Sequence, residues 1–122
     1  MGKKIVLADD EQFISIAYKD GLTRAGFDVS VAHNGEEALA LVKQVVPDLL
    51  LLDLIMPKLN GFEVLKALKA DPALQQIPVI VLSNLSQHTD ETEVRERGAI
   101  DFIVKSDISL QDLVARINAV LT

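Results

Sequence analysis

Short apolar runs alternate with longer stretches of helical character along the whole of this 122-residue chain. Within a run the apolar residues follow one another almost without interruption, which is typical of strands buried on both faces of a parallel sheet. A strand that exposed one face to water would instead alternate apolar and polar residues. The runs therefore predict five strands, at residues 5–8, 29–32, 49–52, 79–82 and 102–104.

The stretches between the runs carry helix signals. The first helix is expected over about residues 12–25, with Gly26 after its end. Its apolar residues recur at spacings that suggest the helical period. These residues are Phe13, Ile16, Ala17, Leu22 and Ala25.

Asparagine marks the start of two more helices. Asn34, followed three residues later by Glu37, has the pattern of a capping box, and Pro47 stops the helix that it opens. Asn60 is expected to cap the next helix in the same way. The last helix, from about residue 109, has the most regular period, with apolar residues at Leu110, Leu113, Val114, Ile117, Val120 and Leu121.

This alternation predicts an α/β fold. We expect a five-stranded parallel sheet in the order 2-1-3-4-5, doubly wound with helices on both faces. Residues 86–97 must supply one crossover helix, but Val94 is their only aliphatic residue, so we expect that helix to be held weakly against the sheet. The length fits a single domain, residues 1–122.

Composition narrows the class of partner. The chain has 18 acidic and 12 basic residues, a formal net charge of −6. It therefore lacks the positive charge with which proteins neutralise nucleic-acid phosphates or bind anionic membranes. No apolar stretch approaches the ~20 residues of a membrane span, and the start of the chain does not resemble a secretory signal. With no cysteine, the chain suits a reducing compartment, and we expect a cytoplasmic protein without direct nucleic-acid or membrane binding.

Charged and polar side chains follow the predicted strands at the point where each strand ends. Asp9 and Asp10 follow the first strand, and Asp53 follows the third. Ser83 follows the fourth strand and Lys105 the fifth. Ligands of doubly wound sheets bind in the crevice at the carboxyl ends of the strands, so we expect these five side chains to converge there.

Such a set of side chains suits metal-assisted phosphoryl chemistry. Clustered carboxylates repel one another, and a hard divalent cation such as Mg²⁺ with oxygen ligands relieves that repulsion. A lysine and a hydroxyl can offset charge on phosphoryl oxygens, and a carboxylate oxygen can act as the nucleophile. No Gly-rich phosphate loop follows the first strand, so a bare cofactor phosphate is not expected there.

In this order and at these strand ends, the residues resemble the receiver domains of two-component response regulators. The matching pieces are Asp9-Asp10-Glu11, then Asp53-Leu54-Ile55-Met56-Pro57 with Gly61, then Ser83, then Asp101-Phe102-Ile103-Val104-Lys105. Together they cover essentially the whole chain. The resemblance implies a CheY-like, flavodoxin-like fold and a phosphorylation-dependent signalling switch that is not a turnover enzyme.

The resemblance also implies a role for each residue of the site. Asp53 would accept a phosphoryl group from a sensor histidine kinase or a histidine phosphotransfer protein, and an unidentified downstream protein would read the result. Ser83 and Lys105 would bind the phosphoryl oxygens. Phe102 lies where the family has an aromatic switch residue whose rotamer is coupled to Ser83.

A metal site is implied in the same way. Mg²⁺, with Mn²⁺ as an alternative, would be bound by Asp10, Asp53 and the backbone carbonyl of Ile55, with Asp9 acting through water. The side chains of Ile55 and Leu85 would flank the path of the water that hydrolyses the aspartyl phosphate. Both are apolar, so we expect a long-lived phosphorylated form.

The sequence departs from the family pattern at three positions. Asn84 stands where a small residue is usual, and it could narrow the entrance to Asp53 or hydrogen-bond to the phosphoryl group. Ser106 follows Lys105 where the family usually has proline, which predicts a trans peptide bond between them. Asn60 replaces a common acidic residue before Gly61, a change that we expect to be neutral.

Two other classes of function remain open at this point. A hydrolase of the haloacid-dehalogenase type also forms an aspartyl phosphate, but such enzymes typically carry a second carboxylate two residues after the nucleophile, where this chain has Ile55. A receiver-like interaction module that is never phosphorylated is the other alternative. The intact set of Asp53, Ser83 and Lys105 argues against it.

Overall fold

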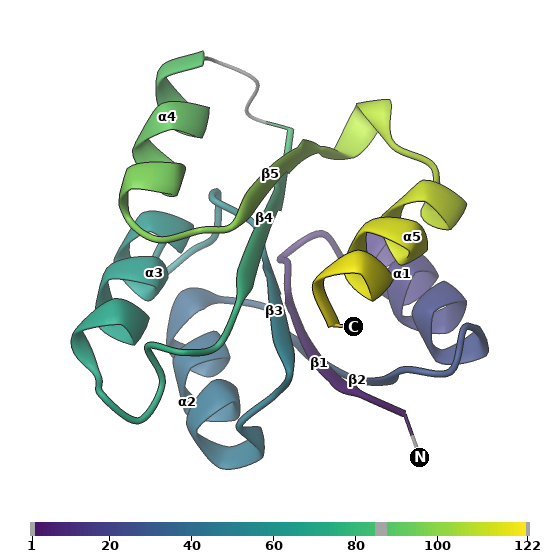
Figure 1. Ribbon diagram of the computed structural model, residues 1–122, viewed down its shortest axis with the longest axis horizontal. Helices are drawn as coiled ribbons and strands as arrows, with labels where there is room; N and C mark the ends of the chain where they lie inside the picture. The colour runs from purple at the N-terminus through teal and green to yellow at the C-terminus, as the bar shows by residue number, and fades with distance from the viewer. Residues whose placement is uncertain (1, 85–87, 122) are drawn as a thin grey trace.

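The structure is a computed structural model that describes residues 2–84 and 88–121 and, for side chains, 2–84 and 91–121. Its centre is a sheet of five parallel strands in the order β2-β1-β3-β4-β5 (Figure 1). The predicted fold class and strand order are confirmed. The strands are β1 (Lys4–Ala8), β2 (Asp28–Ala32), β3 (Leu49–Leu52), β4 (Val79–Ser83) and β5 (Asp101–Val104).

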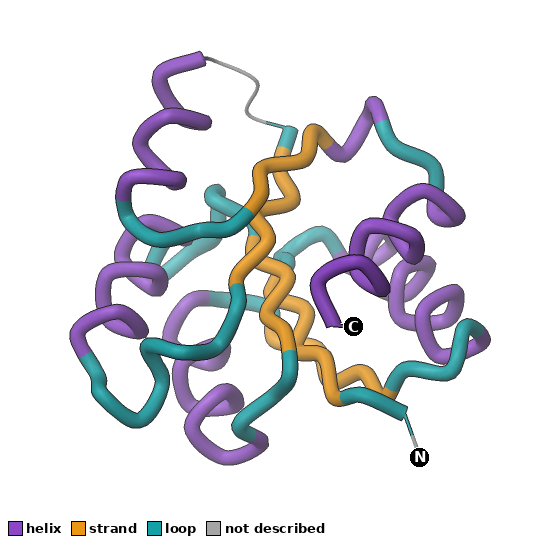
Figure 2. The backbone as a smooth tube through the Cα atoms, viewed as in Figure 1, coloured by secondary structure: helices purple, strands orange, loops and turns teal. Residues whose placement is uncertain are grey.

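Helices cover both faces of the sheet. Figure 1 shows α1 and α5 on one face and α2, α3 and α4 on the other, and Figure 2 shows the strands as the layer between them. None of the described helices is long and apolar enough to cross a membrane. The helices are α1 (Gln12–Arg24), α2 (Gly35–Val45), α3 (Gly61–Ala70), α4 (His88–Glu96) and α5 (Leu110–Leu121), with a short 3₁₀ turn η1 (Lys105–Asp107) before α5.

Side chains along each strand alternate between the two faces. In β3, Leu50 and Leu52 join the apolar core beneath α2, α3 and α4, whereas Leu49 and Leu51 join the core beneath α1 and α5. All four are fully buried. Because both faces are covered, apolar residues are needed at every position of the strand, and polar side chains are left to the strand ends.

Helix α1 forms where the sequence predicts it, but its apolar residues do not share one buried face. Phe13 is 91% exposed and Ile16 is 65% exposed, whereas Ser15 and Leu22 are buried. The half-buried Tyr18 lies between them in sequence and also packs on the core. Apolar residues occur on two sides of this helix, so the period alone could not decide which side meets the sheet and α5.

Both asparagine caps form, but only one capping box is complete. The Oδ1 atom of Asn34 accepts a hydrogen bond from the backbone N–H of Glu37 at 2.8 Å, as predicted. The carboxylate of Glu37 instead accepts from the N–H of His33, at 3.3 Å, so the predicted return bond to Asn34 is wrong. Asn60 and Glu63 form both bonds. The caps differ in φ, −155° for Asn34 and −76° for Asn60, and φ sets the direction of the cap N–H.

Helix α4 has one apolar anchor and an exposed face of ion pairs. Val94 is fully buried, and no other side chain described in α4 is. Arg95 and Arg97 pair with Glu91 and Glu93 one turn earlier, at 3.5 and 3.0 Å. Pairs at this spacing add only a few tenths of a kcal/mol each, so the composition of α4 gives it little to hold it in place.

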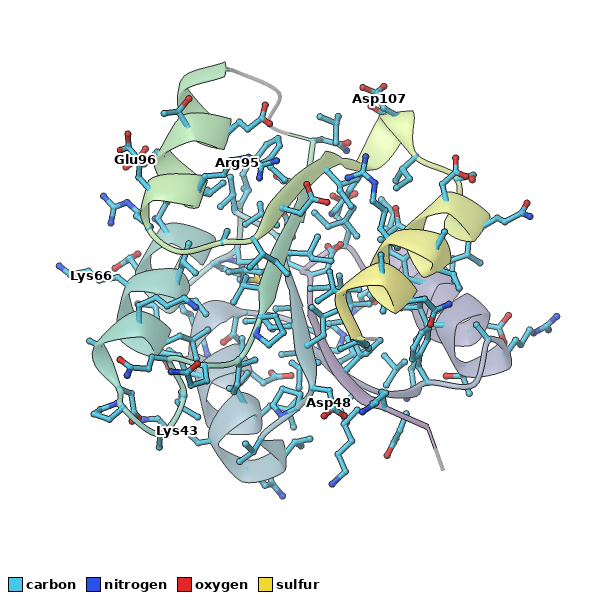
Figure 3. The ribbon with its side chains drawn as sticks, viewed as in Figure 1. Lys43, Asp48, Lys66, Arg95, Glu96 and Asp107 are labelled. Atoms are coloured by element: carbon cyan, nitrogen blue, oxygen red, sulfur yellow. The ribbon has the colours of Figure 1, made fainter. Side chains whose placement is uncertain are left out.

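Strand β5 is tied to the helices on both sides of it by one carboxylate. Asp101 accepts from Arg95 of α4 at 3.2 Å and from Arg116 of α5 at 2.6 Å. Figure 3 shows the labelled Arg95 beside β5. The edge strand that leads into Lys105 is therefore held from α4 and α5 together.

Candidate functional site

The functional side chains lie at the carboxyl ends of neighbouring strands. The backbone N–H of Asp9 donates to the carbonyl of Ala32 at 3.0 Å, and that of Asp53 donates to the carbonyl of Ala8 at 2.9 Å. These bonds continue the sheet by one residue, so both aspartates leave it at fixed positions. Lys105 begins the η1 turn directly after β5. The convergence expected from the sequence is present: Lys105 contacts Asp9 and Asp53, and Asp10 and Ser83 line the same cavity as Asp53.

One buried ammonium group holds the site together. The Nζ atom of Lys105 lies 2.6 Å from Oδ2 of Asp9 and 3.0 Å from Oδ2 of Asp53. A third carboxylate, that of Glu11, lies 3.2 Å from the same Nζ. Lys105, Asp9 and Asp53 are all buried, whereas Glu11 is exposed. A charged group that is buried away from water is stable only beside groups of opposite charge. The charged forms of Lys105 and of the two aspartates therefore stabilise one another.

These contacts shift the pKa values of the buried groups. Burial by itself would lower the pKa of Lys105, but the hydrogen bonds and charges of Asp9 and Asp53 outweigh it and raise that pKa. Burial raises the pKa of Asp9, against the lowering effect of Lys105 and of the Glu11 N–H. The lysine therefore stays positively charged at neutral pH, directly beside Asp53.

The second oxygen of each buried aspartate is held by its own loop. Oδ1 of Asp9 accepts from the N–H of Glu11 at 2.9 Å, and Oδ1 of Asp53 accepts from the N–H of Ile55 at 3.2 Å. Aspartate commonly accepts from the N–H two residues further on in this way. Each carboxylate is thus oriented from two sides, with Oδ1 on the backbone and Oδ2 on Lys105.

Glycine allows α3 to begin against the loop of Asp53. A Cβ atom at Gly61 would lie 2.4 Å from the carbonyl oxygen of Asp53, closer than real Cβ contacts. The N–H of Gly61 donates to the carbonyl of Leu54 at 3.0 Å. The start of α3 and the loop after Asp53 therefore touch through backbone alone, and any side chain at Gly61 would push them apart.

The carboxylates fit a hard divalent cation. Asp9, Asp10 and Asp53 each place a carboxylate oxygen within 4.8 Å of the others. Oδ2 of Asp9 is buried, and among the described residues it contacts the charged Lys105. Asp10 is exposed and leaves room for water. Oxygen donors with space for water are the environment that Mg²⁺ prefers.

A small cavity opens over Asp53. Its volume is about 190 Å³, and it is lined by Asp10, Glu11, Asp53, Ile55, Ser83 and Asn84. Asp53 itself is only 4% exposed, so the cavity is its access to solvent. A phosphoryl group entering here would meet Asp53 at the floor and Ile55 and Asn84 at the walls.

The structure also places the remaining predicted residues. Phe102 is buried on β5 and lines a separate groove against α5, so its coupling to Ser83 stays a prediction. Leu85 lies outside the described residues. No peptide bond among the described residues is cis, so the predicted trans bond between Lys105 and Ser106 is confirmed.

The sequence predicts no role for Glu11, although this residue belongs to the first acidic motif. Glu11 contacts Lys105 across 94 positions of the chain. In the sequence, Glu11 is only the third acidic residue in a row. An acidic residue at this position is equally typical of the solvent-exposed start of a helix.

Comparisons with known proteins agree with this geometry. The family model of the response regulator receiver domain matches residues 5–118. The transcriptional regulatory protein CpxR of Klebsiella pneumoniae is 44% identical over 118 residues, which are 97% of this chain and 49% of CpxR. The regulatory protein PhoP of Bacillus subtilis is 37% identical over 121 residues, 99% of this chain and 49% of PhoP. This chain thus spans about half the length of these curated relatives.

Solved structures show the same fold over the whole chain. The chemotaxis protein CheY4 of Vibrio cholerae superposes with a TM-score of 0.91 at 27% identity, covering 99% of this chain and 100% of CheY4. The BeF3-activated receiver domain of Klebsiella pneumoniae RstA gives 0.90 at 28% identity, covering 97% of each chain. Because the family match runs through every loop that contributes to the acidic cavity, the chain belongs to the response regulator receiver domain family, a phosphoacceptor signalling module and not a turnover enzyme.

Proposed function

We propose that Asp53 is the phosphoacceptor and that a sensor histidine kinase or a histidine phosphotransfer protein supplies the phosphoryl group. The observation that carries this is the carboxylate of Asp53, which lies beside the charged Lys105 and at the floor of a cavity open to solvent. Residues 1–122 would act as one receiver unit. A downstream protein would read the phosphorylated state.

The proposed transfer is a displacement at phosphorus. One carboxylate oxygen of Asp53 attacks the phosphorus of a phosphohistidine, and a new P–O bond forms as the P–N bond breaks. The electron pair of that bond returns to the imidazole nitrogen of the donor, and the product on this chain is an acyl phosphate. Lys105 offsets negative charge on the transferring oxygens, and the Ser83 hydroxyl donates to one of them.

Four groups of this chain would hold the metal ion. Asp10, Asp53 and the backbone carbonyl of Ile55 would bind Mg²⁺ directly, and Asp9 would act through water. Their support is the cluster of carboxylate oxygens within 4.8 Å of one another. When bound, the ion supplies positive charge next to the phosphoryl oxygens and so stabilises the transition state.

Asp53→Asn should abolish phosphorylation, because the amide keeps the shape of the side chain but is not a nucleophilic carboxylate. Incubation of wild type with Mg²⁺ and a small phosphodonor should add the mass of one phosphoryl group, seen by intact mass spectrometry. Asp48→Asn is the matched control, since Asp48 precedes β3 at the end opposite Asp53 (Figure 3). A mass gain at the wild-type rate in Asp53→Asn would show that the acceptor is another residue.

Mg²⁺ should stabilise the fold, because a cation relieves repulsion among the carboxylates. Ligand linkage gives about 1–3 kcal/mol when the metal is at ten- to a hundredfold its dissociation constant. Thermal unfolding with millimolar MgCl₂, compared with NaCl of equal ionic strength, measures this. Asp10→Asn should raise the stability of the metal-free protein and remove most of the response to Mg²⁺. An unchanged melting temperature of wild type in Mg²⁺ would count against the site.

An exposed apolar surface beside the cavity supports a protein as the phosphodonor. Phe13 and Ile16 project from the first turns of α1, which begins one residue after Glu11. Two shallow grooves of about 310 Å³ each share Ile16 and Lys19. Apolar side chains grouped on one helix face and left in water mark a surface for protein contact, and this helix begins next to Glu11, which lines the cavity over Asp53.

Phe13→Ala with Ile16→Ala should therefore slow transfer from a phosphohistidine protein by roughly tenfold or more, as expected for the loss of aromatic and aliphatic anchors. The rate with a small phosphodonor should not change, because neither residue lines the cavity over Asp53. Val46→Ala is the control, since Val46 is an exposed apolar residue at the end of α2. Equal loss with both kinds of donor would refute the docking role.

The phosphorylated form should be long-lived. Ile55 is 57% exposed at the wall of the cavity, and its apolar side chain can neither orient nor activate an attacking water. After the phosphodonor is removed, Ile55→Asn and Ile55→Glu should lose the phosphoryl group roughly tenfold faster or more, because a polar group there can position water.

Lys58→Asn is a control for that experiment, because Lys58 is exposed in the same loop and its φ of 69° suits asparagine. Its dephosphorylation rate should equal that of wild type. If wild type decays within seconds and neither substitution of Ile55 changes the rate, Ile55 does not control access of water.

A further inference from the structure

A hydrogen bond joins the two loops that flank the phosphoacceptor cavity on the side of β4 and β5. The backbone N–H of Ser106 donates to Oδ1 of Asn84 at 3.2 Å. The last paired residues of these strands are Ser83 and Val104, so this bond continues the link between the two strands just beyond the sheet. Asn84 and Ser106 are also two of the three positions where the sequence departs from the family pattern.

The donor in this bond belongs to the turn that carries Lys105. The η1 turn runs from Lys105 to Asp107, and the N–H groups at the start of a helical turn have no partner within it. The side chain of Asn84, in the neighbouring loop, is the hydrogen-bond acceptor for the N–H of Ser106. A proline in place of Ser106 has no N–H and could not make this bond.

The acceptor in this bond belongs to the cavity. Asn84 lines the space over Asp53, together with Ser83 and Ile55. Because Oδ1 of Asn84 faces a backbone N–H, the orientation of the side-chain amide is fixed by its partner. One side chain therefore contacts the turn of Lys105 and also forms part of the wall around the acceptor.

We propose that Asn84 is a positioning residue for phosphoryl binding, which acts through the backbone of Ser106 to hold the η1 turn and so the ammonium of Lys105. This rests on the proposed role of Asp53 as acceptor. The ion-pair partners given for Lys105 are all carboxylates. The carboxylate of Asp53 changes its charge when the phosphoryl group is attached. The bond between Asn84 and Ser106 involves no carboxylate, so it keeps the turn in place while the partners of Lys105 change.

The test uses beryllium fluoride, a phosphoryl mimic that binds the acceptor aspartate without chemistry, titrated with Mg²⁺ and followed by NMR amide shifts. Asn84→Ala and Ser106→Pro should each weaken its binding by roughly two- to tenfold, the range for one exposed hydrogen bond. Ser106→Ala keeps the N–H and should bind as wild type does. Asp107→Asn, at the exposed tip of η1 in Figure 3, should also have no effect.

A double-mutant cycle shows whether the effect passes through Ser106. Asn84→Ala should have no further effect in the Ser106→Pro background, because the bond is already absent there. Amide hydrogen exchange of Ser106 gives a readout that does not need the phosphoryl mimic. It should be faster in Asn84→Ala and remain slow in Asn84→Asp, which keeps an acceptor oxygen.

The outcomes separate this proposal from the one it rests on. If wild type does not bind beryllium fluoride, the acceptor role of Asp53 fails and the positioning role falls with it. If wild type binds but Asn84→Ala binds equally well, only the positioning role is overturned. Equal weakening by Asn84→Ala in the wild-type and Ser106→Pro backgrounds would also overturn it, because Asn84 would then act without Ser106.

Discussion

The buried ammonium of Lys105 is the interaction on which the rest of the site depends. It lies within 3.0 Å of two carboxylates that are themselves buried, those of Asp9 and Asp53. Removing the ammonium of Lys105 would leave the two buried carboxylates uncompensated, which typically costs several kcal/mol. The same arrangement keeps a positive charge beside the acceptor and leaves a cluster of carboxylate oxygens for a metal ion. The balance of charge that stabilises the resting site is thus also the balance that a phosphoryl group and a cation would alter.

The parallel sheet explains why these charges meet at one edge. Both of its faces are covered by helices, so side chains along the strands must be apolar, and polar groups lie where the strands end. Parallel strands bring their carboxyl ends to the same edge, although β1 and β5 are separated by most of the chain. Backbone bonds that extend the sheet fix Asp9 and Asp53, and the bare backbone at Gly61 lets α3 begin against the acceptor loop.

The surfaces around the cavity differ in chemical character. The first turns of α1, directly after Glu11 of the cavity wall, expose the apolar side chains of Phe13 and Ile16. On the other side of the cavity, Asn84 and Ser106 connect the loops after β4 and β5. Asp101 ties β5 to α4 and α5 through its ion pairs with Arg95 and Arg116.

The strands, their order and the polar residues at the strand ends could be predicted from the sequence, because buried parallel strands need continuous apolar runs and leave polar side chains to their ends. The sequence could not choose the buried face of α1, since a helical period sets the spacing of apolar residues but leaves open which side the sheet will cover. Phe13 and Ile16 fit the helical period, yet both are exposed. The contacts of Glu11 with Lys105 and of Asn84 with Ser106 join segments that are distant in sequence. These contacts could not be predicted from the sequence, because the pairing of such side chains follows from where the fold places their backbones.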